Sequence, residues 1–390
     1  MENKVIQINN IRIPKNALVQ ESLLMAFILL SPVYKCIADI TIAGFNVITI
    51  LVGALLICYI SNIVQVINSR QQRFFSLTIL VAFCIELFFV SKDNHIGWIL
   101  SMLLYVSFLQ TDTGVSLNKI CRVFLISSIV AAIFSLSVGV VGGAITRAAS
   151  LVDGSIAPIA VTIILFRDTK SLNQQTKSYG ALKVLSMISS IIVLAFGMSR
   201  ARFLIVGLIF AVYGASKLMH SGMKASRKKV ICFVVTFVLI LLLFTSGAIL
   251  NLFEPIIDRF LNEGLDSMGR DVEAEFGLRL FKENLFFGAG WGTYTLLNLS
   301  GSIVSYANHS AYIALLARGG LFVAIPTFLS YYLLLKKSWR IRKSSSMALA
   351  LLLVFLLLSY GNAGMFNYTI CSIIPVAVLD IKKELYHENQ

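Results

Sequence analysis

The chain has few charged residues and few residues that could bind a metal or form disulfides. Of its 390 residues only 13% are charged, whereas soluble domains average about 25%. It has four histidines and six cysteines, and no two cysteines have the spacing of a zinc or redox motif. These shortages exclude a soluble globular enzyme, a disulfide-stabilised scaffold and a disordered tail.

Hydrophobic sequence takes the place of the missing charge. Hydrophobic residues make up 57% of the chain, and the mean hydropathy is +0.84. Apolar runs alternate with short polar breaks, and a run that is apolar on every face predicts a helix surrounded by lipid or by other helices. We therefore predict an all-α, polytopic integral membrane protein with about 12 transmembrane helices. The expected spans are 17–34, 42–65, 74–91, 96–110, 120–141, 154–167, 184–198, 203–219, 230–250, 310–334, 346–361 and 366–380.

The positive charge predicts the orientation of these helices. The net charge is +14, but about two thirds of the 33 Lys and Arg residues fall in alternate breaks that would share one side of the membrane. Basic residues gather on the cytoplasmic side of membrane proteins. The pattern therefore places both termini in the cytoplasm and argues against a nucleic-acid partner. The first apolar run is expected to be retained rather than cleaved as a signal peptide.

One long outer segment divides the chain into three parts. We expect transmembrane helices over 1–250, an outer loop over 251–309 and further transmembrane helices over 310–390. A single long loop is often functional. Residues 267–287 predict an amphipathic helix that could lie along the membrane surface. It is followed by Gly288-Ala-Gly-Trp-Gly292, whose glycines permit either a simple turn or a close approach of the backbone to a ligand.

Arginines on the outer side predict an anion-binding site. Arg200 and Arg202 open a span, where a helix N-terminus adds free N–H groups to two guanidinium groups. Anchoring at the membrane interface is the alternative. Arg279 lies four residues after Glu275, so a helical ion pair is its alternative.

Two further arginines lie on the same side. Arg147 is in an outer break, and Arg318 lies early in the span 310–334, where a charge should face a cavity or a partner. A substrate that carries phosphate would be neutralised by arginine alone, because no Asp-x-Asp pair lies on the outer side to hold Mg²⁺ or Mn²⁺. We therefore expect no metal and no cofactor.

One histidine and several aromatic residues complete the candidate site. His309 precedes the span 310–334, where the helix dipole disfavours the imidazolium and keeps the ring able to accept a proton; capping or packing is the alternative. The aromatic residues could stack on sugars or form an interfacial belt. They are Trp291, Tyr294, Tyr306 and Tyr312.

Three motifs, in this order, resemble the bacterial O-antigen polymerase and O-antigen ligase superfamily. They are Ser199-Arg200-x-Arg202-Phe-Leu, Arg279-Leu-Phe-Lys-Glu-Asn-Leu-Phe-Phe-Gly288-x-Gly290-x-Gly292, and Asn308-His309-Ser-x-Tyr312 with Gly319-Gly320 downstream. The stretch from Arg147 to Pro158 also resembles a feature of the family, so the resemblance covers residues 147–335. Arg318 departs from ligase-like members, in which an acidic or neutral residue is expected, and this favours a polymerase.

The resemblance implies a metal-independent membrane glycosyltransferase of the C-type fold class. It would lie in the bacterial inner membrane, with the loop 251–309 and the active site in the periplasm. A polymerase transfers the growing glycan from undecaprenyl pyrophosphate to a sugar hydroxyl of the next lipid-linked repeat unit, and a membrane protein that regulates chain length would be its partner. The alternatives are a ligase, which transfers the glycan to lipid A–core, and a lipid-linked oligosaccharide flippase.

The resemblance and the outer arginines together imply a role for each candidate residue. His309 would take the proton of the acceptor hydroxyl, and Arg279 would stabilise the leaving pyrophosphate. Further pyrophosphate contacts would come from Arg200, Arg202, Arg147 and Arg318. Substrate contacts would come from Tyr294, Asn308, Tyr312, Gly290 and Gly292. A flippase should instead carry polar groups deep between its spans, where this chain has only Glu21, Glu86 and Arg318.

Overall fold

The structure is a computed structural model, and it describes most of the chain. The described residues are 5–8, 11–42, 45–64, 70–89, 96–111, 114–141, 144–145, 151–167, 177–197, 199–220, 270–292, 295–297, 303–305, 310–361 and 366–388. The expected span 230–250 lies outside them.

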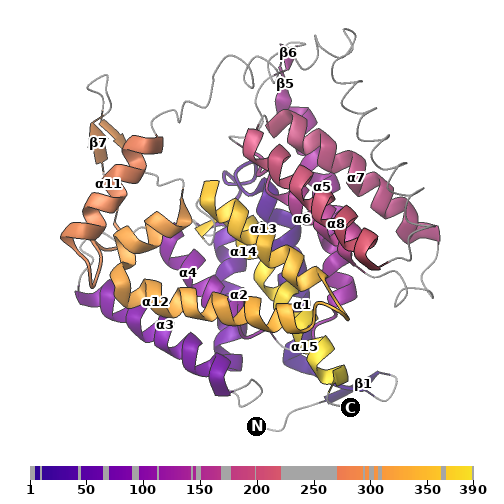
Figure 1. Ribbon diagram of the computed structural model, residues 1–390, viewed down its shortest axis with the longest axis horizontal. Coiled ribbons are helices and arrows are strands. Elements are labelled where there is room, and N and C mark those ends of the chain that lie inside the picture. The colour runs from indigo at the N-terminus through magenta and orange to yellow at the C-terminus, as the bar shows by residue number, and fades with distance from the viewer. Residues whose placement is uncertain are drawn as a thin grey trace.

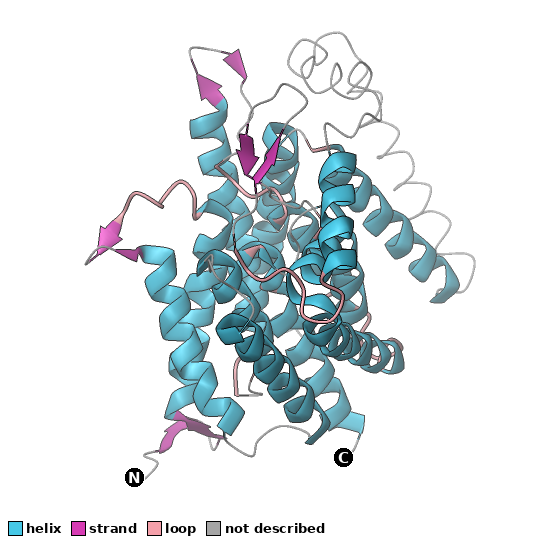
Figure 2. Cartoon of the chain, turned by 90° about the vertical axis from the view of Figure 1, so that its left-hand side faces the viewer, coloured by secondary structure: helices cyan, strands magenta, loops and turns pink. Residues whose placement is uncertain are grey.

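The described chain is mostly helical, as the apolar runs predict (Figure 2). The helices of the first half are α1 (Lys15–Leu30), the 3₁₀ turn η1 (Ser31–Val33), α2 (Val47–Val64), α3 (Arg70–Phe89), α4 (Ile96–Phe108), α5 (Leu117–Gly139) and α6 (Ile156–Phe166). Those of the second half are α7 (Lys177–Gly197), α8 (Arg200–His220), α11 (Arg270–Glu283), α12 (Ala311–Arg340), α13 (Met347–Gly361), α14 (Tyr368–Cys371) and α15 (Ile373–Glu388).

Four short antiparallel hairpins, absent from the predicted elements, lie before or between the helices. They are β1–β2 (Val5–Ile8 and Ile11–Pro14), β3–β4 (Thr41–Ile42 and Phe45–Asn46), β5–β6 (Val140–Val141 and Ala144–Ile145) and β7–β8 (Thr295–Leu297 and Ile303–Ser305). In the last hairpin Thr295 pairs with Ser305 and Leu297 with Ile303. Their strands are too short for hydropathy to separate them from the polar breaks in which they lie.

Three of the described helices are long and apolar enough to cross a membrane. They are Leu117–Gly139, Tyr179–Gly197 and Ala311–Arg340, and seven shorter apolar helices accompany them among the described residues. The chain is therefore an α-helical protein with the helices needed for membrane association. The count of about 12 spans stays a prediction, because several apolar helices are shorter than the roughly 20 residues that a span usually needs.

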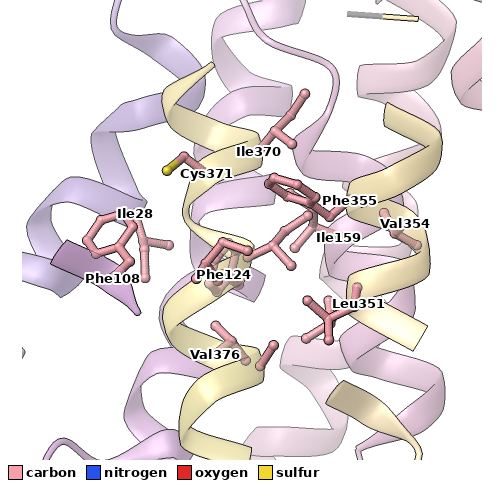
Figure 3. Close-up of a cluster of buried hydrophobic side chains, with 14 of the residues drawn as sticks. Ile28, Phe108, Phe124, Ile159, Leu351, Val354, Phe355, Ile370, Cys371 and Val376 are labelled. Atoms are coloured by element: carbon pink, nitrogen blue, oxygen red, sulfur yellow. The ribbon is translucent and has the colours of Figure 1, made fainter. Parts of the chain in front are cut away.

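Apolar side chains from helices far apart in the sequence form the core. Figure 3 shows part of this cluster, in which Phe108 of α4 lies beside Ile28 of α1 and Phe124 of α5 lies toward Val376 of α15. Small polar residues also join the helices: Ser128 of α5 and Ser186 of α7 share a hydrogen bond of 2.7 Å between hydroxyl oxygens. Such bonds hold helices together where apolar packing alone does not select a partner.

Polar contacts gather at one end of the bundle, where β1 and the last turns of α15 lie (Figures 1 and 2). We call it the terminal end and define it by Glu21, Lys119, Arg167 and Asp380. Lys119 Nζ lies 2.6 Å from Glu21 Oε1, and Arg167 Nη1 lies 3.7 Å from Asp380 Oδ1. These contacts join α1, α5, α15 and the residue that follows α6.

We call a second group of residues the opposite end and define it by Asp153, Arg202, Trp98, Arg318 and Trp291; they come from α4, α8, α12 and the segments next to α6 and α11. The sequence analysis assigns the breaks of the terminal end to one side of the membrane and those of the opposite end to the other. Which side of a membrane each end faces stays a prediction.

Candidate functional site

The first turn of α8 carries a buried ion pair. Arg202 Nη2 lies 3.1 Å from Asp153 Oδ1, and both side chains are largely buried. The guanidinium also packs against Gly154, where an added Cβ would lie 2.8 Å from Arg202 Nη1. The sequence Asp153-Gly154 therefore provides both the counter-charge and the space that Arg202 occupies. A phosphate at this arginine would have to share the guanidinium with Asp153.

Backbone and side-chain hydrogen bonds fix Asp153. Its N–H donates to Pro32 O at 2.7 Å, and its Oδ1 accepts the N–H of Ser155 at 2.9 Å. Burial raises the pKa of this carboxyl, but the Arg202 charge, the hydrogen bond from Ser155 and the nearby Asn367 side chain outweigh burial, so its pKa lies below the ordinary value. Asp153 is therefore ionised at neutral pH, and the pair with Arg202 is charged.

The glycine segment after α11 packs into a break in α12. The helix α12 has non-helical backbone at Gly320 (φ 52°, ψ −164°). Below the break, Leu321 N and Phe322 N donate to Leu285 O and Phe286 O, each at 2.9 Å. The carbonyl groups of Leu285 and Phe286 thus satisfy amides that the interrupted helix leaves without a partner inside α12.

The same segment satisfies the carbonyl groups above the break. Ala289 N donates to Ala317 O at 2.8 Å, and Gly290 N donates to Arg318 O at 3.0 Å. Gly288 has φ 67°, and a Cβ there would collide with Arg318 O. Irregular backbone in a membrane protein survives only where protein or a cavity satisfies it, and here residues 285–290 satisfy both halves of the break.

Arg318 is buried beside this break. Its Nη1 donates to Gly292 O, and its guanidinium carbon lies 4.4 Å from the centroid of the Trp98 ring. Trp98 in turn packs edge-on against Phe366 at 4.6 Å between ring centroids. The expectation that this charge faces a partner is met by a backbone carbonyl and an aromatic face.

Trp291 is the centre of the same cluster and is fully buried. Its Nε1–H donates to Glu86 Oε2 of α3 at 2.8 Å, and its ring packs edge-on against Phe83 at 5.0 Å. The prediction that Trp291 stacks on a sugar or lies in an interfacial belt is wrong, because its side chain is fully buried. The sequence shows that Glu86 is the one acidic residue of α3. It does not show that Glu86 bonds to Trp291.

The opposite end has two groups of residues, one around Asp153 and Arg202 and one around Arg318 and Trp291. The segment from Phe366 to Tyr368 lies between these groups. Phe366 contacts Trp98 and Trp291, while the next residue, Asn367, helps to lower the pKa of the Asp153 carboxyl. The structure therefore brings Arg202 and Arg318 to the two sides of one short segment. Each of the two arginines already has a partner within the protein.

Arg279 lies apart from Arg202. It is exposed on α11, with its guanidinium carbon 5.2 Å from the centroid of the Phe276 ring. Figure 1 draws α11 at the left of the molecule and α8 toward the right, and α11 packs on α12. Arg279 is therefore available to a ligand, on the side of the glycine segment rather than on the side of Asp153.

Several candidate residues fall outside the described part of the chain. These are Arg147, Tyr294, Asn308, His309 and the side chain of Arg200. The structure begins α8 at Arg200 and begins α12 two residues after His309. Tyr312 is described, and its hydroxyl donates to Leu356 O at 3.0 Å. Gly290 and Gly292 are both buried in the break of α12.

An apolar groove of about 590 Å³ runs beside the break, between α3 and the second half of α12. Phe286 of the loop, Leu321 and Phe322 line it beside the break, and Phe74, Val81 and Ile325 line the rest. An apolar chain could lie in it, with its polar head directed toward the glycine segment.

Among the residues that the structure describes, no group of three or more His, Cys, Asp or Glu side chains could hold a metal ion. The candidate base His309 is not among those residues, so a metal-free reaction stays a prediction.

Comparison with known proteins adds no assignment. A scan against protein-family models finds no match, and a search of curated proteins finds none either. The function therefore has to be argued from the motifs and from the geometry of the opposite end.

Proposed function

We propose that the chain is a membrane glycosyltransferase that polymerises lipid-linked oligosaccharides, such as O-antigen or a related surface polysaccharide. The donor is a glycan on undecaprenyl pyrophosphate, and the acceptor is a sugar hydroxyl of the next lipid-linked repeat unit. The protein has about 12 spans and a C-type fold, and it lies in the inner membrane with both termini in the cytoplasm. The reaction takes place in the periplasm, and a chain-length regulator is the membrane partner.

The observation that carries this proposal is the contact between two of the motifs that resemble the polymerase and ligase superfamily. The glycine motif ends at Gly292, and the Gly319-Gly320 pair follows the histidine motif in the sequence. In the structure the first motif fills the break that the second makes in α12. The two motifs therefore form one structural unit, and this unit lies next to the buried Arg318.

The chemistry needs charge stabilisation more than covalent help, because pyrophosphate is already a good leaving group. The acceptor oxygen attacks the anomeric carbon and forms the new glycosidic bond. The bond from that carbon to the pyrophosphate oxygen breaks, and its electron pair leaves with the lipid diphosphate. The proton of the acceptor hydroxyl goes to His309. Arg279 stabilises the departing diphosphate.

The apolar groove supports a lipid-linked substrate. A polyprenyl chain is apolar and flexible, and burial of each CH₂ group contributes about 0.8 kcal/mol. The groove reaches Phe286, four residues after Lys282 in α11 and seven after Arg279. A tail in the groove would therefore bring a diphosphate head toward the exposed cations at the end of α11.

The test uses purified protein with lipid-linked repeat units and no lipid A–core. The expected product is a ladder of longer glycans, resolved on a gel or by mass spectrometry, and it should form in the presence of a chelator. Repeat units that remain single would refute the polymerase. Transfer that appears only after lipid A–core is added would identify a ligase instead.

A further inference from the structure

Glu86 is a carboxyl group in an otherwise apolar part of α3. It is fully buried and is the one acidic residue of that helix. A carboxyl at such a depth is costly and is usually retained for function. Its Oε1 has no hydrogen-bond partner among the described residues, so an apolar residue would pack here at lower cost. Any function of Glu86 within the protein must therefore come from the contact that its other oxygen, Oε2, makes.

That other oxygen accepts the indole N–H of Trp291 at 2.8 Å. The two residues are 205 positions apart in the sequence, so the bond ties α3 to the glycine segment. The Trp291 ring lies between Phe83 and Phe366, with centroid distances of 5.0 Å and 5.7 Å. Packing and the hydrogen bond together leave the indole one orientation.

The orientation of Trp291 decides where its two neighbours in sequence lie. Gly290 N donates to Arg318 O, and Gly292 O accepts a hydrogen bond from Arg318 Nη1. A Cβ on Gly319 would lie 3.2 Å from Trp291 Cζ2, so the indole packs directly against the break of α12. Moving Trp291 would therefore move Arg318 and the segment that follows α11.

We propose that Glu86 is a positioning residue for glycan transfer: through Trp291 it fixes the glycine segment and Arg318, and thereby the place of α11 and its Arg279. This role rests on the proposed function. It requires a hydrogen-bond acceptor at position 86 rather than a charge. Glu86→Gln keeps an acceptor for the indole, whereas Glu86→Leu removes it and keeps the approximate volume.

A spectroscopic signature tests the contact without any assay of activity. The chain has three tryptophans, so a protein labelled with 5-fluorotryptophan gives three fluorine resonances, and Trp291→Phe assigns one of them. We expect Glu86→Leu to shift the Trp291 resonance and Glu86→Gln to leave it near the wild-type position. Glu21→Gln, a buried acid of the terminal end, is the matched control and should leave it unchanged.

Steady-state kinetics test the role. A displacement of reacting groups by about 1 Å can cost about 10²-fold in rate, so Glu86→Leu should lower kcat by that order with a small change in KM. Glu86→Gln should restore kcat to within a few-fold of wild type. Trp291→Phe should lower kcat similarly, and the double variant should be no worse than either single one, because both remove the same bond.

The outcomes separate this proposal from the proposed function. An unshifted Trp291 resonance in Glu86→Leu, or a shifted resonance with unchanged kcat, would overturn the role of Glu86 while transfer by wild type stands. If Glu86→Leu does not fold, the test uses Glu86→Gln instead. A folded Glu86→Gln protein that has an unshifted Trp291 resonance and a low kcat would overturn the role of Glu86. A wild-type protein without transfer activity would instead refute the function itself.

Discussion

The two ends of the helix bundle use buried charge in different ways. At the terminal end each buried carboxylate uses both oxygens: Glu21 contacts Lys119 Nζ and accepts the N–H of Ser116, and Asp380 accepts two hydrogen bonds and pairs with Arg167. At the opposite end Asp153 and Glu86 each keep one buried oxygen without a hydrogen-bond partner among the described residues.

The backbone is also more regular at the terminal end than at the opposite end. The described helices that meet at the terminal end are regular there, whereas at the opposite end α12 is broken and three glycines have positive φ within four residues of Trp291 or Arg318. Strain and incompletely bonded polar groups persist where function requires them. The two ends therefore differ in their carboxylates and in their backbone, and the proposal that the opposite end holds the substrate rests on this difference.

The largest expected effect comes from closing the break of α12. Gly320→Ala places a Cβ against Gly288 N and Phe286 O, both of which are backbone atoms that cannot rotate away. We expect a loss of more than about 4 kcal/mol in the free energy of unfolding, a size reached when a structure must rearrange. Thermal unfolding in detergent measures it.

The control for this variant is Gly207→Ala in α8, where a Cβ meets nothing within 4 Å. Alanine favours a helix over glycine by up to about 1 kcal/mol, so this change should be neutral or stabilising. A Gly320→Ala protein as stable as the control would contradict the packing of the glycine segment in the break.

The next effect compares one carboxylate from each end. Asp380→Asn and Asp153→Asn each leave a buried arginine without its counter-charge, and removal of one partner of a buried pair costs about 3–5 kcal/mol. Both variants should therefore unfold at lower temperature. Turnover per folded molecule should fall only for Asp153→Asn. Equal loss of turnover in the two variants would remove the functional distinction between the ends.

A third change should affect activity and spare stability. Arg279 is exposed, so Arg279→Ala should alter the free energy of unfolding by no more than about 0.5 kcal/mol. If Arg279 stabilises the leaving diphosphate, turnover should fall by about 10²–10³-fold, and long glycans should disappear from cells that make normal amounts of protein. Lys343→Ala, which removes an exposed cation just after α12 and away from α11, is the control. Normal chain length in Arg279→Ala would remove Arg279 from the site.

The smallest effect is a pH dependence at the opposite end. The pKa of Asp153 lies below its ordinary value because Arg202 and Ser155 stabilise the ionised form against burial. Its stabilisation is therefore complete above the ordinary carboxyl pKa and is lost as pH falls toward the lower, folded-state pKa. The gap in unfolding temperature between wild type and Asp153→Asn should narrow in that acidic window. A gap that widens with acid would contradict the charged pair.

Sequence reasoning predicts elements better than it predicts contacts. Hydropathy locates the helices, and the amphipathic stretch 267–287 corresponds to α11, observed over Arg270–Glu283. The bond between Glu86 and Trp291 could not be predicted, because periodicity carries no information about which helices meet. For the same reason the glycines of both motifs are visible in the sequence, while the insertion of one motif into the other is not.

Sequence and structure can be compared for two of the candidate arginines. The sequence indicates that Arg202 and Arg318 belong to one end, and the structure places them on the two sides of the segment from Phe366 to Tyr368. Their partners, Asp153 and the carbonyl of Gly292, depend on tertiary packing. The roles assigned to His309, Asn308, Tyr294 and Arg147 stay predictions.

Photo-cross-linking tests most directly whether the opposite end is the reaction site. A polyprenyl-diphosphate-linked oligosaccharide with a diazirine near the diphosphate is irradiated with the purified protein, and the labelled peptides are identified by mass spectrometry. The account predicts adducts in the end of α11, in residues 284–292 and in the first half of α12, and fewer of them in Arg279→Ala. Adducts concentrated around Lys119, Arg167 and Asp380 would contradict it.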